Sequence, residues 1–240
     1  DIFDEYSIEI LEKNLKYVYG IKIQASVLKN KKIISKLSKI NLKNKKIILN
    51  ISGKNILEIK SIISEFELIH SKEIILQCGY QDYPTSLKET NFNKVLIIKK
   101  KFPKYRSSYA DHIDSEDFLS LITPIIAIGH KCSVIEKHIS LKGKKSQFDN
   151  YSSLDYKKTE EMIKLVNFFL IKNKYFISKK ETNYLNNSVQ IPVINKNIKK
   201  NQLLNIDNIS YLRTNYANNK IHDLDINKYY LAKKKINKHE

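Results

Sequence analysis

The chain has 240 residues, of which 42% are apolar, and this suffices for one large core or for a core with a small second domain. No apolar stretch reaches the ~20 residues of a membrane helix, which predicts a protein that binds no membrane. The two cysteines form no zinc motif or disulfide framework, which predicts a cytoplasmic protein. The formal net charge of +18 comes almost entirely from lysine rather than from the arginine that reads bases and phosphates, which predicts a solvated surface and no nucleic-acid partner.

Strands rich in β-branched residues alternate with segments of helical apolar spacing over most of the chain. After an opening helix at 4–16, strands are expected at 19–26, 45–52, 73–79, 105–111 and 133–140. Each is followed by an expected helix, at 30–40, 55–66, 91–102, 115–129 and 155–175. Asn55 and Glu58 have the spacing of a capping box, and Ser115 is expected to cap the helix that it begins.

This alternation predicts the α/β class. Strands that are almost continuously apolar, separated by helices, favour a parallel sheet that is covered on both faces. Five such units fit an open doubly wound sheet or part of an eight-stranded barrel, and periodicity does not choose between them. The chain has five glycines and no glycine-rich phosphate loop.

The composition changes after about residue 176. The segment 176–187 is polar and loses the helical period, so it is expected to be a linker. From residue 188 to 240 the pattern is one of short strands between polar turns, which predicts a small β-rich module.

Polar side chains gather at the carboxyl ends of the predicted strands, where α/β proteins build their sites. These residues are Ser26, Asn50, Ser52, Gln77, Cys78, Asp111, His112, Glu136 and His138. Their recurrence at five successive strand ends predicts the rim of an active site.

His112 and His138 end neighbouring strands and are candidates to bind one divalent metal ion, because neutral imidazole is a common ligand. Asp111 and Glu136 are close enough in sequence to ligate the ion or to orient the imidazoles. The alternative is two unrelated histidines, one capping a helix and one in the core.

Several motifs occur in an order that resembles the sialic acid (N-acetylneuraminate) synthase family, which includes the legionaminic and pseudaminic acid synthases. They are "LQCGYQDYPT" (76–85), "YADHID" (109–114), "VIEKHISL" (134–141), "FDNYSSLD" (148–155) and "IKKNQLLNIDNISYLR" (198–213). The resemblance implies a (β/α)8 TIM barrel with strands four to eight present in residues 1–175. It also implies a C-terminally incomplete SAF (antifreeze-like) domain at 188–240.

The resemblance further implies an enzyme that condenses phosphoenolpyruvate with an N-acylated hexosamine, such as N-acetylmannosamine. The expected product is a nine-carbon 2-keto sugar acid, released with phosphate. The expected cofactor is a divalent metal ion, Mn²⁺ or Mg²⁺. A homodimer is also implied, in which the SAF domain of one subunit covers the site of the other.

The motifs assign a role to each candidate residue by resemblance. His112 and His138 match the metal ligands, while Glu136 and Asp149 match acids that act beside the metal on water and on the sugar hydroxyls. The residues expected to bind substrate are Lys22, Asn50, Gln81, Tyr83 and Arg213, of which Arg213 would reach the partner subunit's site.

The chain also departs from the family pattern. Ala110 replaces the serine of the "SDH" motif and Asn150 replaces a histidine, while the "YPT" loop and the interval from His112 to His138 are longer than usual. Two alternatives therefore stay open: another phosphoenolpyruvate-condensing barrel, and a non-catalytic relative. Because strands one to three are missing from the pattern, the 240 residues alone are expected to be inactive and poorly stable.

Overall fold

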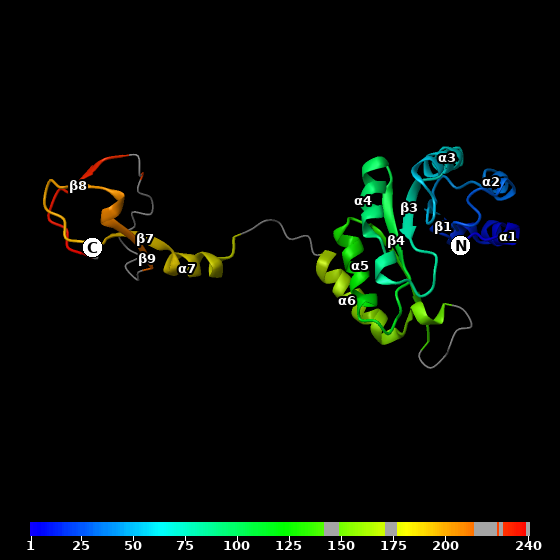
Figure 1. The fold of residues 1–240 in the computed structure, drawn as a ribbon. Helices are drawn as coiled ribbons and strands as arrows, with labels where there is room; N and C mark the ends of the chain where they lie inside the picture. Colours follow the sequence, from blue (N-terminus) through cyan, green and yellow to red (C-terminus); the bar gives the residue numbers. More distant parts are fainter. Residues whose placement is uncertain (142–148, 171–176, 214–224, 226–227, 239–240) are drawn as a thin grey trace. The chain divides into compact units, whose positions relative to one another are not determined.

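The computed structural model describes residues 1–141, 149–170, 177–213, 225 and 228–238 (Figure 1). The chain divides into two compact units, Asp1–Ile171 and Lys172–Glu240. Residues 171–175 of the expected last barrel helix and residue 176 of the expected linker lie outside the described residues, as do 214–224, 226–227 and 239–240 of the expected module. In the described ranges, no helix has both the length and the apolar character needed to cross a bilayer.

Six parallel strands form the sheet of the first unit. They are β1 (Gly20–Ile23), β2 (Lys46–Asn50), β3 (Glu73–Gly79), β4 (Arg106–Asp111), β5 (Val134–Ile139) and β6 (Ser153–Leu154). Their spatial order is β1-β2-β3-β4-β5-β6. This order follows the chain without reversal, as in a barrel, whereas a doubly wound sheet has a switch point. The five predicted strands are confirmed, and the short β6 was not predicted.

The helices of the first unit agree closely with the apolar spacing. They are α1 (Glu5–Asn14), α2 (Lys31–Leu37), α3 (Ile56–Glu67), α4 (Phe92–Lys101), α5 (Leu119–Gly129) and α6 (Tyr156–Leu170). Three 3₁₀ turns also occur, at Leu15–Tyr17, Leu87–Glu89 and Asn150–Ser152.

The capping box of Asn55 and Glu58 is confirmed at the start of α3. The prediction that Ser115 caps α5 is wrong. Its backbone N–H donates to Tyr151 O at 2.6 Å, a turn follows, and the helix begins only at Leu119.

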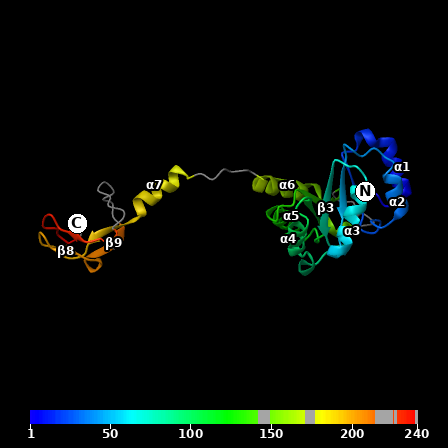
Figure 2. The same cartoon turned by 90° about the horizontal axis from the view of Figure 1, so that it is seen from above.

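The two faces of the sheet differ in chemistry. Alternate strand residues such as Ile47, Leu49 and Leu76 join side chains of the helices in one large hydrophobic cluster. Figures 1 and 2 show these helices beside the strands. The residues between them on the opposite face are polar towards the carboxyl ends, as Lys22 and Gln77 are. The hydrophobic cluster lies on the helix side alone, but the polar face is also largely buried, since Lys22 is 8% and Gln77 0% exposed.

The edges of this sheet are lightly paired. Ile2 forms an isolated parallel bridge with Ile23, and its N–H donates to Lys22 O at 2.8 Å, so the first residues run beside β1. At the other edge, β6 contributes two residues. This pairing leaves most of both edges of the described sheet open.

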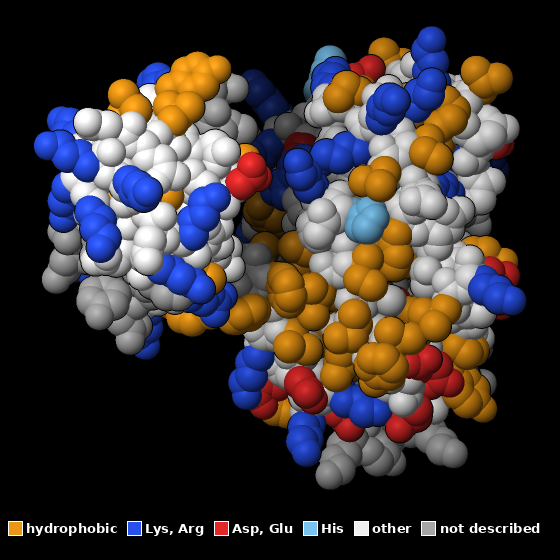
Figure 3. Space-filling model, turned by 60° about the vertical axis from the view of Figure 1, so that its left-hand side comes forward, with side chains coloured by type: hydrophobic (Ala, Val, Ile, Leu, Met, Phe, Trp, Pro, Cys, Tyr) orange, Lys and Arg blue, Asp and Glu red, His pale blue; other side chains and the backbone are white. Residues whose placement is uncertain are grey.

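The side of the first unit formed by α4, α5 and α6 carries many exposed apolar side chains. Helix α6 has no buried residue, although Phe168 and Phe169 are among its side chains. Leu96 and Ile97 of α4 and Ile126 of α5 are also exposed. Figure 3 shows hydrophobic side chains gathered in this way on one face.

The second unit begins with a helix where a linker without helical period was expected. Helix α7 (Lys179–Ser188) starts at an N-cap, Ser178, whose side chain accepts a hydrogen bond from Lys180 N, and Glu181 lies in the first turn. A cap and a favourable charge thus stabilise a helix that is too polar to show an apolar stripe.

The rest of the second unit is β-rich, as predicted. Strand β7 (Gln190–Ile194) pairs antiparallel with β9 (Ile209–Arg213), and β8 (Leu203–Leu204) pairs antiparallel with β10 (Tyr230–Leu231). A 3₁₀ turn at Ile206–Asn208 precedes β9. Asn201 has φ 65°, a left-handed conformation that asparagine adopts more readily than most residues. The SAF assignment stays a prediction.

Candidate active site

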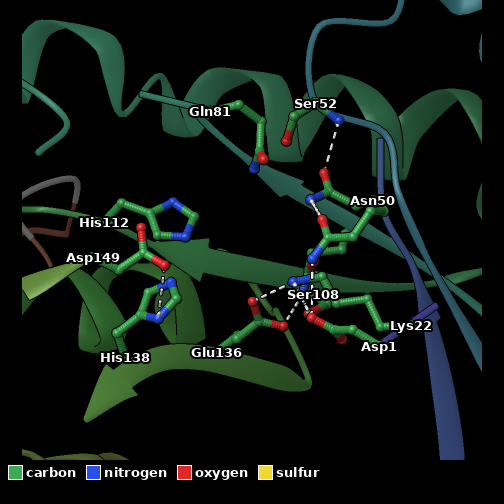
Figure 4. A network of polar contacts seen from close by, with 12 residues as sticks. Asp1, Lys22, Asn50, Ser52, Gln81, Ser108, His112, Glu136, His138 and Asp149 are labelled. Atoms are coloured by element: carbon green, nitrogen blue, oxygen red, sulfur yellow. Dashed lines mark hydrogen bonds and ion pairs between the residues drawn. The ribbon is translucent and has the colours of Figure 1, made fainter. Parts of the chain in front are cut away.

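A cavity of about 490 Å³ opens at the carboxyl ends of the strands in the first unit. Its lining includes seven of the nine predicted site residues, namely Lys22, Gln81, Tyr83, His112, Glu136, His138 and Asp149. Figure 4 shows most of these side chains converging from successive strand ends and loops. The sheet order thus brings together residues that lie far apart in the sequence.

The two histidines face each other across neighbouring strands. His112 directly follows β4, His138 lies near the end of β5, and their ring centroids are 5.2 Å apart. His112 Nδ1 lies 3.0 Å from Tyr80 O, and because a carbonyl can only accept, this nitrogen carries the proton. Burial, assisted by the nearby His138, lowers the pKa of His112 to about 4. His112 is therefore a neutral imidazole whose Nε2 retains its lone pair.

Asp149 and Tyr83 border the histidine pair. Asp149 Oδ2 lies 3.9 Å from His138 Nδ1, and the residue adopts a left-handed backbone with φ 57° at the start of the Asn150–Ser152 turn. The ring of Tyr83 packs edge-on against His112 and His138, with centroid distances of 4.3 and 6.0 Å. These contacts fix one wall of the cavity.

A partly buried ion pair lines the cavity. Lys22 Nζ donates to Glu136 Oε1 and also lies 3.7 Å from Asp1 Oδ2, while Gln77 Nε2 donates to Glu136 Oε2 at 3.1 Å. Burial opposes the ionisation of Glu136, but the hydrogen bonds and charge of Lys22, with Gln77, bring the pKa of its carboxyl below the ordinary value. Glu136 is thus held as a carboxylate.

Asn50 and Gln81 take different positions relative to the cavity. Asn50 is fully buried; its Oδ1 accepts from Ser52 N at 3.1 Å and its Nδ2 donates to Gln24 Oε1 at 3.3 Å. It therefore holds the loop after β2 rather than lining the cavity. Gln81 lines the cavity and accepts a hydrogen bond from Tyr83 Oη at 3.3 Å.

Asp111 does not orient His112 as the sequence suggested. Adjacent strand residues face opposite sides, so Asp111 points to the helix side, where Lys137 Nζ donates to its Oδ2 at 2.6 Å. The two residues are register partners of β4 and β5, and both side chains are at most 2% exposed. Lys137 and Asp111 each directly precede a histidine, in "EKH" and "ADH", so strand alternation places both on the face opposite the histidines. This ion pair was not predicted from the sequence.

Gln77 and Tyr80 are two other residues whose part in the site was missed. Gln77 was recognised as a strand-end polar residue, but not as a partner of Glu136. Tyr80 contributes through its backbone carbonyl, which no side-chain pattern reveals.

Arg213 lies apart from this cluster in the sequence, at the end of β9 in the second unit, where it is exposed. Its expected reach into a partner subunit's site stays a prediction.

The donor set around the histidines suits a divalent ion only in part. Within the described ranges, no three His, Cys, Asp or Glu side chains are gathered so as to hold one ion together. The two imidazoles nevertheless fit such an ion as a pair, and the Tyr80 carbonyl orients His112 as outer-shell partners of metal ligands do. An ion here would take its other ligands from water or substrate, as catalytic sites allow.

Comparison with known proteins identifies a matching family model and a curated relative. The family model described as the NeuB family matches residues 2–170. An uncharacterized protein of Methanocaldococcus jannaschii is 28% identical over 159 residues, which are 65% of this chain and 45% of that protein. The chain thus spans about half the length of the curated relative that it matches.

Solved structures share the fold at low identity. One, from Chromobacterium violaceum, is described as a spore coat polysaccharide biosynthesis protein E; it matches with a TM-score of 0.71 and 18% identity, over 99% of this chain and 69% of that chain. The N-acetylneuraminic acid (sialic acid) synthetase of Leptospira borgpetersenii matches with a TM-score of 0.62 and 20% identity, over 76% of this chain and 61% of that chain. At these identities the likeness is one of fold.

Proposed function

Because the chain belongs to the NeuB family, we propose that its first unit carries the site of an enzyme that condenses phosphoenolpyruvate with an N-acylated hexosamine. The product is a nine-carbon 2-keto sugar acid, and phosphate is released. The observation that carries this proposal is the placement of the His112–His138 pair beside the Lys22–Glu136 pair in one cavity.

His112 and His138 would hold a divalent ion, Mn²⁺ or Mg²⁺. When bound there, the ion supplies Lewis-acid polarisation of the acceptor's aldehyde oxygen. The contribution of the chain is to keep His112 neutral and to fix its ring through Tyr80 O.

Lys22 would bind the negative charge of phosphoenolpyruvate. Lys22 lines the cavity and its side chain is 8% exposed, so its attraction for an anion is weakly screened by water. Asn50, through the loop that it holds, and Gln81, directly, would present polar groups to the same substrate.

Glu136, Asp149 and Tyr83 would serve the acceptor side. Glu136, ionised and held by Gln77, would orient a water molecule beside the reacting carbon. Asp149, beside His138, would accept hydrogen bonds from sugar hydroxyls. Tyr83 covers both imidazoles and would exclude bulk water from them.

The remaining parts of the proposal concern the whole protein. Residues 1–175 would form the later strands of a TIM barrel, 176–187 its connection to the next domain, and 188–240 an SAF domain. In a cytoplasmic homodimer this domain would bring Arg213 to the partner subunit's site, where a planar guanidinium suits an acyl oxygen.

The test measures metal binding and catalysis separately. Mn²⁺ binding is titrated calorimetrically on the 240-residue chain and on its His112→Gln variant, with His70→Gln, an exposed histidine, as the control. We expect His112→Gln to weaken binding at least about tenfold and His70→Gln to leave it unchanged.

Catalysis is measured as phosphate release by the product of the whole reading frame that contains this sequence, given phosphoenolpyruvate, Mn²⁺ and N-acetylmannosamine. Metal binding without phosphate release from any N-acyl hexosamine would indicate a non-catalytic relative. Release with aldose phosphates alone would indicate another phosphoenolpyruvate-condensing barrel.

A further inference from the structure

A second cavity of about 700 Å³ lies beside the candidate active site. It is formed by the ends of β2 and β3 and by the connection from β3 to α4, and it shares Ser52 and Gln81 with the first cavity. Of the residues given a role in the proposed reaction, only Gln81 and Tyr80 line it, and Tyr80 acts there through its backbone carbonyl. The second cavity therefore calls for its own explanation.

Lys94 places a half-buried positive charge at this cavity. The residue lies in the first turn of α4, and its Nζ donates to the neutral acceptor Ile51 O at 3.3 Å. The ion pairs of the described residues include none with Lys94, and burial lowers the pKa of its ammonium group. A partly desolvated ammonium without an anionic partner favours an anion beside it.

Ser52 supplies a hydroxyl that lacks a partner. The residue is 4% exposed, and its Oγ has no hydrogen-bond partner in the described structure. Most buried hydroxyls are hydrogen-bonded, so an orphan hydroxyl on a cavity wall points to a ligand. The next residue, Gly53, has φ 71°, and a Cβ built on it would meet nothing within 4 Å, so space is open beside this wall.

The acidic residues of the cavity are already engaged. Glu89 accepts hydrogen bonds from Tyr80 Oη at 2.8 Å and Ser86 Oγ at 2.7 Å, and Asp82 Oδ1 accepts from Tyr83 N at 3.0 Å. Lys88 adds a second ammonium group to the lining and forms no ion pair in the described residues. The cationic groups left to meet an anion are thus the two lysines, and the Ser52 hydroxyl lies on the same cavity wall.

We propose that this second cavity is an oxyanion subsite, in which Lys94 Nζ and Ser52 Oγ bind a phosphate or carboxylate group. The anion has two possible sources. It is either a charged substituent of the acceptor sugar, whose aldehyde end lies at the histidine pair, or a separate anion that occupies the subsite alone. The first source rests on the proposed function and would make the acceptor a sugar phosphate or a sugar acid; the second does not depend on it.

Binding is tested with inorganic phosphate on the 240-residue chain. Amide chemical shifts are followed by NMR, because shifts at Gly53 and Lys94 report the subsite, whereas shifts at His112 and His138 report the first cavity. We expect Lys94→Met to weaken the phosphate-dependent shifts at Gly53 at least tenfold and Ser52→Ala to weaken them severalfold. Lys100→Met, an exposed lysine at the end of the same helix, should leave them unchanged.

Circular dichroism establishes that each variant is folded. The proposal is overturned if phosphate causes no shift at Gly53 and Lys94 in the original chain, or if folded Lys94→Met responds as the original chain does. Neither result bears on condensation, so failure of the subsite and failure of the proposed function are distinguishable.

The source of the anion is then decided kinetically with the product of the whole reading frame. Phosphate release is compared for a neutral N-acyl hexosamine and for its 6-phosphate ester. If the anion belongs to the acceptor, Lys94→Met raises KM for the ester at least tenfold and leaves KM for the neutral sugar unchanged. If the anion is separate, both KM values stay unchanged, while the shifts caused by inorganic phosphate are still lost.

Discussion

At the scale of single residues, the buried pair of Asp111 and Lys137 occupies the positions directly before the two candidate metal ligands. The pair joins β4 to β5 on the helix side, while His112 and His138 project from the polar side. Burial raises the pKa of Asp111, and the ammonium of Lys137 opposes this effect, so the carboxylate depends on its partner. The pair thus anchors the two strand ends from which both imidazoles extend.

Lys137→Met removes the charge that compensates Asp111. We expect the free energy of unfolding to fall by about 3–5 kcal/mol, because an unpaired charge is left buried. The double variant Asp111→Asn/Lys137→Met should recover most of the loss, since it leaves no buried charge. Urea denaturation of the three proteins measures both effects, and equal losses in the single and double variants would contradict the explanation.

Gly79 marks a close approach between β3 and β4, next to the residue that orients His112. A Cβ at this position would lie 2.8 Å from Ala110 O, a backbone atom that cannot move aside alone. Gly79→Ala should therefore separate the strands and cost about 1–3 kcal/mol of stability, with a shift of the Tyr80 carbonyl. Gly129→Ala is the control, because a Cβ there meets nothing within 4 Å. Thermal unfolding curves compare the two variants, and equal midpoints would show that the added Cβ at position 79 costs no stability.

At the scale of elements, the capping box of α3 fixes where the helix begins after the loop that Asn50 holds. Asn55 Oδ1 accepts from Glu58 N, and Glu58 Oε2 accepts from Asn55 N, both at 3.0 Å. Asn55→Ala should lower the free energy of unfolding by about 1 kcal/mol. Asn93→Ala, at an exposed position in α4, should have little effect. A loss in urea denaturation that is no larger for Asn55→Ala than for Asn93→Ala would show that the box contributes nothing.

Strands and helices were predictable where local pattern and tertiary structure agree. The alternation that buries Ile47 and Leu49 also dictates the strand, and the spacing of Ile59, Ile62 and Phe66 dictates α3. Prediction failed where a feature is short or polar. The two-residue β6 has no pattern of its own, and α7 is stabilised by its cap rather than by an apolar stripe.

The candidate site was predictable only as a set of strand ends. The sequence places polar residues at five strand termini, but it does not say which face each one takes. The position of Asp111 behind the site, rather than in it, follows from the register with Lys137. The backbone carbonyl of Tyr80 and the second cavity arise from three-dimensional placement of a loop, which residue types do not encode.

At the scale of the whole molecule, the two units have hydrophobic cores of unequal size. Among the described residues, the cluster of the second unit has three buried members, Ile194, Ile198 and Ala232, whereas the cluster of the first unit extends from Ile2 to Cys132. Stability grows with the apolar surface that a domain buries. The second unit is therefore expected to unfold first on heating.

Calorimetry tests this expectation with one variant in each core. Ile198→Ala should lower the transition of the second unit and leave that of the first in place, whereas Ile59→Ala should do the reverse. Each change removes a fully buried isoleucine and should cost its own unit about 2–5 kcal/mol. A single transition that both variants shift equally would show that the two units unfold together.

The register of β4 and β5 also bears on how freely this protein can change in length over evolution. Asp111 opposite Lys137 sets the separation of the two imidazoles, whereas the residues that run through α5 lie outside that constraint. Insertions and deletions in the connection should thus be neutral for the site, while one residue gained or lost within either strand would turn a histidine to the wrong face. The long interval between His112 and His138 is therefore compatible with an intact site and does not indicate loss of function.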